Sequence, residues 1–436
     1  MIYFLPVLLA FYTIFIYLMC RDVLNQAFIF TAVFFVASAN LMSNVLTVGV
    51  SLHFETVAYI FLGCVFFSLG AFLVGGKSLK VVKMTLLHLN KRNQFNTNSV
   101  FLTVILIFNL LSIAYILREV YTLTRIYGSY SGSLLGSLSV FAEVQKFQNI
   151  GLRVGYISTF LTAFLEAEAY VSGYILVKNF VEKQKNKILF FLCFISSFLS
   201  TFCQGSRGGV FILISLVFIY IMLYRKQRNT KRISFKIIGK IIITIFIAFM
   251  AFMLAGIIAG KMWDVSWYEY LSVYLGFPIY NLDGAIMNGI PRSKISGSAS
   301  FGGLYSNILP RLGIDYQSYT AYTGSSGFNR LNGHNMGNVY TIFKALNADY
   351  GYVGSLIALF IIGMLLQLLY NKALKDNKQI SMMQILYAYF LSCTAFSFFS
   401  NMICGNISIF HLFEFAFGYV WVFLLTKKQN VQQSEE

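Results

Sequence analysis

The hydrophobic pattern divides the chain into apolar segments separated by polar connections, and a helix that spans a bilayer needs about 20 apolar residues. The pattern predicts eleven such segments: 2–19, 27–48, 56–74, 99–117, 155–177, 188–204, 208–224, 241–259, 351–370, 381–399 and 403–425. One interval between them, 260–345, is polar, glycine-rich and much longer than the other connections. We therefore expect the chemistry on water-soluble groups in this interval and at its borders.

The composition supports the same picture. Hydrophobic residues make up 58% of the chain and charged residues 11%, whereas soluble domains carry about 25% charged residues. The sequence predicts an all-α polytopic membrane protein with about 11 transmembrane helices and one long outward loop. Its expected parts are residues 1–259 with helices 1–8, the loop 260–350 with short helices, residues 351–425 with helices 9–11, and the tail 426–436. We interpret the apolar N-terminus as a first transmembrane helix, because it lacks a basic region and a cleavage site.

The basic residues predict the orientation. The net charge of +17 is scattered over short loops, so it indicates orientation signals and no nucleic-acid partner. With connections placed alternately on two sides, one side holds 22 basic residues and the other 5, the long interval left aside. Because cytoplasmic loops are rich in Lys and Arg, we expect the N-terminus and the long loop outside and the C-terminus in the cytoplasm. The six cysteines lie in or beside apolar segments and show no disulfide or zinc spacing.

Arginines in two places suit an anionic ligand. Arg207 stands in Gly205-Ser206-Arg207-Gly208-Gly209 at the junction of two predicted helices. A guanidinium binds two oxygens of a phosphate at once, and flanking glycines let a ligand approach closely. We interpret Arg207 as an anion site; an interfacial arginine that meets lipid phosphates is the alternative.

The long loop carries a second group of cations. Between positions 290 and 335 these are Arg292, Lys294, Arg311 and Arg330, against one acid, Asp315. A diphosphate would bind such a patch through charge-assisted hydrogen bonds. Ordinary solvated loop charges are the alternative for each residue.

Three side chains are candidates for proton transfer. His334, in Gly333-His334-Asn335, is suited to act as a base near neutral pH, and a structural histidine is the alternative. Asp349 lies where the loop re-enters the membrane, and a helix cap is the alternative for it. Glu166 lies inside a predicted membrane helix, where a carboxylate needs a partner.

Several short motifs carry a resemblance to a known family. They are Ser206-Arg207-Gly208, Leu309-Pro310-Arg311-Leu312, Asn338-Val339-Tyr340-Thr341 and Asp349-Tyr350-Gly351-Tyr352-Val353-Gly354. In this order on a polytopic chain with a long outward loop, they resemble the Wzy-type O-antigen and oligosaccharide repeat-unit polymerases of bacteria. The His334-Asn335 pair is also similar to the histidine in the large outward loop of O-antigen ligases.

The resemblance implies glycosyl transfer on the outer face of the bacterial cytoplasmic membrane, for lipopolysaccharide O-antigen or capsular polysaccharide. The donor is a glycan on undecaprenyl diphosphate and the acceptor a single lipid-linked repeat unit. The implied catalytic residues are His334, Asp349 and Glu166. The implied diphosphate and substrate ligands are Arg207, Arg292, Arg311, Arg330, Asn335, Asn338 and Tyr340.

This chemistry requires no cofactor and no metal. Besides the lipid-linked oligosaccharides and membrane lipids, the implied partners are a flippase and a chain-length regulator. Two alternatives stay open at this point. One is an O-antigen ligase or another lipid-linked glycosyltransferase, and the other is a transporter that flips lipid-linked sugars.

Overall fold

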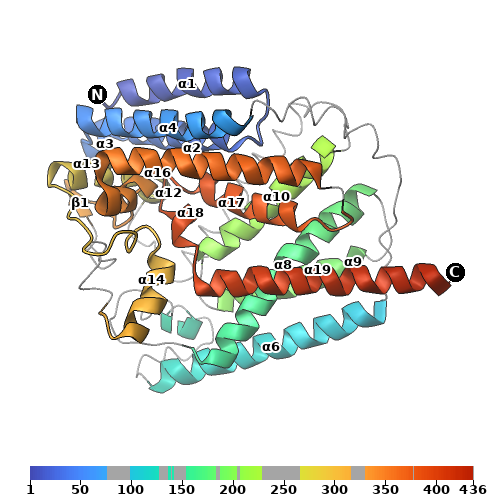
Figure 1. Ribbon diagram of the computed structural model, residues 1–436. Helices are drawn as coiled ribbons and strands as arrows, with labels where there is room; N and C mark the ends of the chain where they lie inside the picture. Colours follow the sequence, from blue (N-terminus) through green and yellow to red (C-terminus); the bar gives the residue numbers. More distant parts are fainter. Residues whose placement is uncertain are drawn as a thin grey trace. The chain divides into compact units, whose positions relative to one another are not determined.

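The computed structural model describes residues 1–75, 99–126, 136–138, 140–141, 154–182, 187–203, 207–227, 266–315, 329–376 and 378–435. These form an all-α protein with one short β-hairpin (Figure 1). The longer helices are α1 (Phe4–Cys20), α2 (Gln26–Ser43), α4 (Phe54–Gly75), α6 (Ser99–Ile126), α8 (Tyr156–Glu182), α9 (Lys187–Cys203), α10 (Arg207–Gln227), α16 (Ile342–Lys375), α17 (Met382–Ala395) and α19 (Ile409–Glu435). The short elements are α3 (Val45–Val48), α12 (Trp267–Leu275), α13 (Phe277–Met287), α14 (Gly302–Ile308), the 3-10 helix η2 (Leu309–Leu312), β1 (Asn329–Leu331), β2 (His334–Gly337) and α18 (Met402–Gly405).

Many of these helices suit a membrane. Seven of the described helices are long and apolar enough to cross one, and three further apolar helices are shorter. Ten of the eleven predicted segments coincide with a helix, and the segment 241–259 lies outside the described residues. Several predicted boundaries are wrong: α16 begins at Ile342 and not at 351, α6 extends to Ile126 and not to 117, the segment 27–48 is divided between α2 and α3, and α19 begins at Ile409 after the separate turn of α18.

The chain forms two compact units that are interleaved along the sequence. Unit 1 consists of Met1–Met84, Asp264–Lys375 and Phe390–Ile409, and unit 2 of Thr85–Trp263, Asp376–Tyr389 and Phe410–Glu436. The predicted parts followed chain order, whereas the units combine helices that are distant in sequence. Each unit is described by itself below.

In unit 1, α4 and α16 pack at very short range because glycines line their contact. A Cβ at Gly70 would lie 1.9 Å from the carbonyl oxygen of Phe360, and one at Gly363 would lie 2.1 Å from that of Phe67. Between them, the Phe67 ring stacks on Phe30 of α2 with centroids 4.2 Å apart. Small residues let membrane helices approach until backbones touch, so this contact depends on the missing side chains.

One turn beyond Gly363, polar side chains join α16 to α2. Gln26 on α2 donates to the Oε1 atom of Gln367 on α16 at 2.8 Å, and Asn25 donates to the same atom at 3.1 Å. Both side chains are buried. Interhelical hydrogen bonds of this kind hold membrane helices together where no hydrophobic force acts between them.

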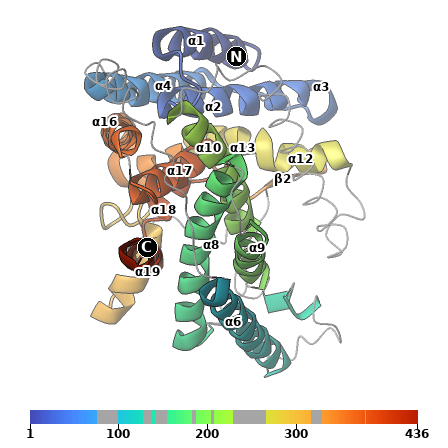
Figure 2. The ribbon, with the colours of Figure 1, turned by 90° about the vertical axis from the view of Figure 1, so that its right-hand side faces the viewer.

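Unit 2 is built around α8. In the 18-residue apolar stretch of this helix, 78% of the residues are buried. α8 packs against α9 and α10, and α9 packs against α6 (Figure 2). Glu168 on α8 is buried, and its Oε2 atom accepts hydrogen bonds from Asn109 of α6 at 2.6 Å and from Ser197 of α9. A buried carboxylate is tolerated when it has such donors.

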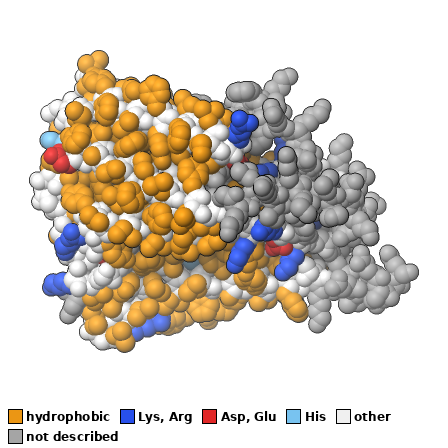
Figure 3. Space-filling model, turned by 45° about the horizontal axis from the view of Figure 1, so that its top comes forward, with side chains coloured by type: hydrophobic (Ala, Val, Ile, Leu, Met, Phe, Trp, Pro, Cys, Tyr) orange, Lys and Arg blue, Asp and Glu red, His pale blue; other side chains and the backbone are white. Residues whose placement is uncertain are grey.

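The described helices expose many apolar side chains on their surface. Hydrophobic side chains cover most of the face seen in Figure 3, and charged side chains lie toward its edges. Exposed residues include Phe11, Leu73, Leu111 and Val353, each at least 66% accessible. A soluble protein seldom exposes so large an apolar surface, and lipid contact explains it.

Candidate functional site

The candidate site lies at the end of unit 1 where α12, α13, the β-hairpin and the start of α16 meet, which we call the loop end. The hairpin turns through Asn332-Gly333, and both residues have positive φ, 49° and 84°. A two-residue turn between antiparallel strands requires these values, which Asn and Gly adopt most readily. The Asn332 side chain also donates to the carbonyl of Val48 at 3.0 Å, so the turn is held against the end of α3.

The hairpin brings His334 to a carboxylate. Its Nδ1 atom lies 3.0 Å from Oε1 of Glu269 on α12. Because an ionised carboxylate only accepts, Nδ1 carries the proton and the lone pair of the neutral ring is on Nε2. The His334 side chain is 35% exposed, so part of the ring is open to a ligand. A histidine oriented by a carboxylate is the arrangement of a general base.

Glu269 was not predicted, although its position carries a sequence signal. Ser266 is the N-cap residue immediately before α12, and its side chain accepts a hydrogen bond from the backbone N–H of Glu269 at 3.2 Å. Ser266-x-x-Glu269 is thus a helix-capping pair, in which the glutamate often bonds back to the cap residue. Here the carboxylate binds the histidine.

The hairpin places His334 on one face and its predicted neighbours Arg330 and Asn335 on the other. Leu331 pairs with His334 across the strands, and Arg330 pairs with Asn335. Successive side chains point to opposite faces of a strand, so Arg330 and Asn335 share one face and His334 is on the other. Asn335 stabilises the local chain, because its Oδ1 accepts from the Gly337 N–H at 2.8 Å.

A second cluster surrounds a break in α16. Gly351 has φ 70° and ψ −173°, a conformation that interrupts the helix and is open to glycine alone. Arg292 lies directly on it: a Cβ at Gly351 would be 2.2 Å from one terminal guanidinium nitrogen and 2.8 Å from the central carbon. The other terminal nitrogen donates to the Asn347 carbonyl at 2.8 Å.

This arrangement presents a fixed cation. The Arg292 side chain is exposed, and a guanidinium has five N–H donors of which one is used by Asn347. Carbonyls at the end of a helical stretch carry partial negative charge and hold a cation in place. Broken helices of this kind mark substrate and ion sites in membrane proteins.

Asp349 has the contacts of an anchor. Its two carboxylate oxygens accept from the backbone N–H groups of Ala299 and Ser300, at 3.1 Å and 2.6 Å. Asn401 donates to the Ser300 carbonyl at 2.7 Å, which holds the same loop from its other side. Both carboxylate oxygens are thus engaged by backbone donors. Asp349 therefore fixes the loop that carries Arg292.

Tyr340 and Asn338 lie in the chain between β2 and α16, and both are half-buried. The Tyr340 hydroxyl accepts from Asn329 at 3.2 Å, and the ammonium of Lys344 lies 3.3 Å from the centre of the Tyr340 ring. A cation over an aromatic face is attracted by the ring electrons. The pair adds a positive charge to the start of α16.

The remaining predicted residues lie elsewhere. Arg311 is exposed on η2. Arg207 is the first residue of α10, and its side chain lies outside the described residues. Glu166 belongs to unit 2, where its carboxyl group faces Glu414 on α19, and Glu414 accepts a hydrogen bond from Tyr170 at 3.0 Å. The loop end of unit 1 therefore contains His334 and Arg292 together with Arg330, Asn335, Asn338, Tyr340 and Asp349, and the roles assigned to all of these residues stay predictions.

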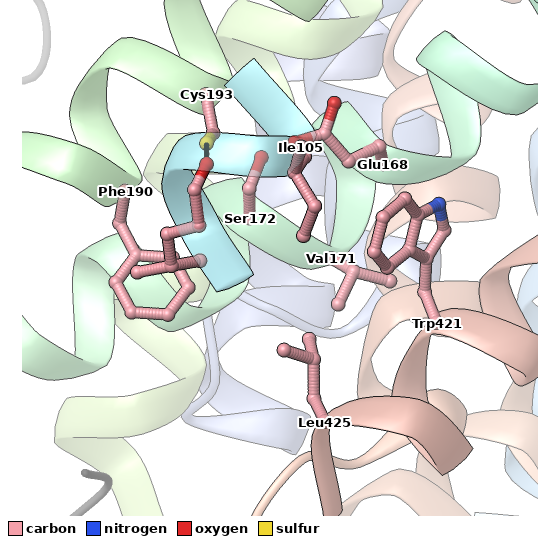
Figure 4. Close-up of a pocket in the computed structure, with 9 residues that line it drawn as sticks. Ile105, Glu168, Val171, Ser172, Phe190, Cys193, Trp421 and Leu425 are labelled. Atoms are coloured by element: carbon pink, nitrogen blue, oxygen red, sulfur yellow. Dashed lines mark hydrogen bonds between the residues drawn. The ribbon is translucent and has the colours of Figure 1, made fainter. Parts of the chain in front are cut away.

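Unit 2 contains a small apolar pocket (Figure 4). Its cavity volume is about 10 Å³, between α6, α8, α9 and α19, which is barely the space of one water molecule. Glu168 lies at its wall beside Val171 and Ser172, and Trp421 and Leu425 close another side. It is therefore too small to hold a lipid chain or a sugar. Among the described residues, no group of three or more metal-ligating side chains is present.

Comparison with known proteins gives no relative. No protein-family model, no curated protein and no solved structure matches the chain. The functional assignment therefore depends on the chemistry of the residues and on the family resemblance of the motifs.

Proposed function

We propose that this protein is a membrane glycosyltransferase that polymerises oligosaccharide repeat units linked to undecaprenyl diphosphate. The observation that carries the proposal is the contact of Arg292 with the helix break at Gly351. This contact holds an exposed guanidinium in a fixed position, at the point where the proposed outward loop returns to the membrane. A diphosphate leaving group needs such a charge-matched donor and little else. The proposed setting is the outer face of a bacterial cytoplasmic membrane, with eleven spans and the loop 260–350 outside.

The proposed reaction uses the two clusters of the loop end. The acceptor hydroxyl attacks the anomeric carbon of the donor sugar, and its proton passes to Nε2 of His334. The bond from the anomeric carbon to the diphosphate oxygen breaks, and the released lipid diphosphate keeps the electron pair. Arg292 donates hydrogen bonds to the diphosphate as charge develops on it. Glu269 stabilises the imidazolium that forms on His334.

The glycan pattern of a deletion strain tests this function. Such a strain should make product with one repeat unit and none longer, and the wild-type gene should restore the ladder. Loss of the single-repeat product as well would contradict a polymerase and indicate a ligase or a flippase. A wild-type distribution of glycan lengths in the deletion strain would contradict the proposed function.

The His334–Glu269 pair gives a prediction about proton transfer. His334→Gln keeps a hydrogen-bonding side chain but cannot carry the proton, so long glycan should fall by about 100- to 10,000-fold. Glu269→Gln should have a smaller effect, because the amide still orients the ring. Leu331→Ala, across the strand pair from His334, is the control for damage to the hairpin. Normal ladders from His334→Gln at wild-type protein level would show that the histidine is structural.

The orientation is tested by accessibility of introduced cysteines. Leu312 on η2 is 67% exposed, and Lys378, between α16 and α17, is also exposed. In a cysteine-free background, a membrane-impermeant thiol reagent should label Leu312→Cys in intact spheroplasts. Lys378→Cys should react only after the membrane is opened. The reverse pattern would invert the proposed topology.

A further inference from the structure

A histidine–carboxylate pair outside the site described above joins α13 to the start of α4. Asp283 on α13 is 3% exposed. Its Oδ1 atom accepts from the backbone N–H of His53 at 3.0 Å and from the hydroxyl of Thr56 at 2.5 Å, and its Oδ2 atom lies 2.8 Å from Nδ1 of His53. All three bonds can form with a neutral imidazole that carries its proton on Nδ1, and a second proton on the ring makes the third bond charge-assisted and stronger.

The imidazole of His53 is open to solvent. Its side chain is 54% exposed, whereas that of Asp283 is buried. The hydrogen bond to Asp283, followed by the charge of that carboxylate, raises the pKa of His53, and Glu55 on α4 acts in the same direction. Tyr280 on α13 also faces Asp283, and burial raises the pKa of its phenol, so it stays neutral near pH 7. The proton on His53 therefore titrates at or above the usual range for histidine.

The sign of the linkage follows from the raised pKa. Below the unfolded pKa of about 6.5 the folded and unfolded imidazole are both protonated, and the attraction between the charged ring and Asp283 contributes fully to stability. As the pH rises through the folded pKa of His53, this contribution is lost. The joint between α13 and α4 is thus tighter in acid than in alkali.

The same helix holds the hairpin that carries His334. Asn281, two residues before Asp283, donates to the carbonyls of Met336 at 2.9 Å and Val339 at 3.0 Å. Its Oδ1 atom accepts from Asn329 on β1 at 2.9 Å. Residues two apart lie on different sides of a helix, so α13 binds His53 with one side and the hairpin with another.

We propose that His53 and Asp283 form a proton-controlled joint that positions the His334 hairpin. A proton on His53 tightens its contact with Asp283, and α13 transmits the position to β1 and β2 through Asn281. His53 is a positioning residue. Its effect on glycan synthesis rests on the proposed function, whereas its effect on the hairpin does not.

Hydrogen exchange on the purified full-length protein tests the joint. In the wild type, protection of peptides covering residues 329–340 should fall at least about fivefold between pH 6 and pH 9, after correction for intrinsic exchange; this is the lower end of typical coupling between sites. His53→Lys keeps the positive charge and should stay protected at both pH values. His53→Gln keeps a hydrogen-bond donor without a titratable proton and should show low, pH-independent protection.

Glu55→Gln is the matched control. It leaves all three bonds to Asp283 in place and removes one cause of the raised pKa, so the transition should move to lower pH. A wild-type pH profile in His53→Gln, or a change confined to α4 and α13, would overturn the joint. If the hairpin responds as expected while His334 variants make normal glycan, the joint stands and the proposed function fails.

Discussion

Gly351→Ala should remove nearly all long glycan while leaving the protein in the membrane. A Cβ at this position would lie 2.2 Å from the Arg292 guanidinium, so the guanidinium must leave the break. Loss of one preorganised donor at a developing negative charge typically costs about 100- to 1,000-fold in rate. Glycan chain length and protein level, measured in a deletion strain that carries the variant, check this result.

Gly289→Ala is the control for the backbone cost of that substitution. Gly289 also has a positive φ, 75°, but a Cβ there meets nothing within 4 Å. Both substitutions place alanine in an unfavourable backbone conformation, at a cost of about 1–3 kcal/mol. Of the two, only Gly351→Ala displaces Arg292. Arg292→Lys should resemble Gly351→Ala, because lysine is a point charge without the planar fork. Equal ladders from the variants at 289 and 351 would contradict a role for Arg292.

Gly363→Leu should prevent the folding of unit 1. The substituted side chain would meet the backbone of α4, whose Phe67 carbonyl already lies 2.1 Å from the position of a Cβ. Backbone cannot rotate away as a side chain can, so the two helices must separate and lose their contact. Overpacking a core costs about 1–3 kcal/mol when neighbours can adjust, and we expect the upper end or more here. The melting temperature in detergent and the yield of membrane-inserted protein measure the effect.

Gly75→Leu, at the end of α4, provides the comparison. A Cβ at Gly75 would lie 3.7 Å from the Gln367 side chain, an ordinary contact. Both variants add the same apolar side chain to a membrane helix, but only the one at 363 meets backbone. Similar melting temperatures for the two would show that α4 and α16 are not held by close backbone contact.

The helices themselves could be predicted from the sequence for a local reason. Lipid offers no partner for backbone N–H and C=O groups, so a long apolar segment must form a helix. Segments such as 56–74 and 155–177 therefore appear as α4 and α8. The turn at Asn332-Gly333 is equally local, since both residues tolerate positive φ. Boundaries next to glycine or a polar turn were less certain: α16 starts before its Gly351 break, and α18 separates from α19 at a point with no strong hydropathy change.

The sequence by itself determined the membrane class and the residue types available at the loop end, His334 and Arg292 among them. Only the tertiary structure decided which groups they contact. It places Glu269 beside His334, seats Arg292 on Gly351, and binds Asp349 to the backbone of Ala299 and Ser300. The physical reason is that a local pattern fixes backbone hydrogen bonding within a segment, whereas these contacts join residues about 50 to 65 positions apart and depend on how α12, the hairpin and α16 pack.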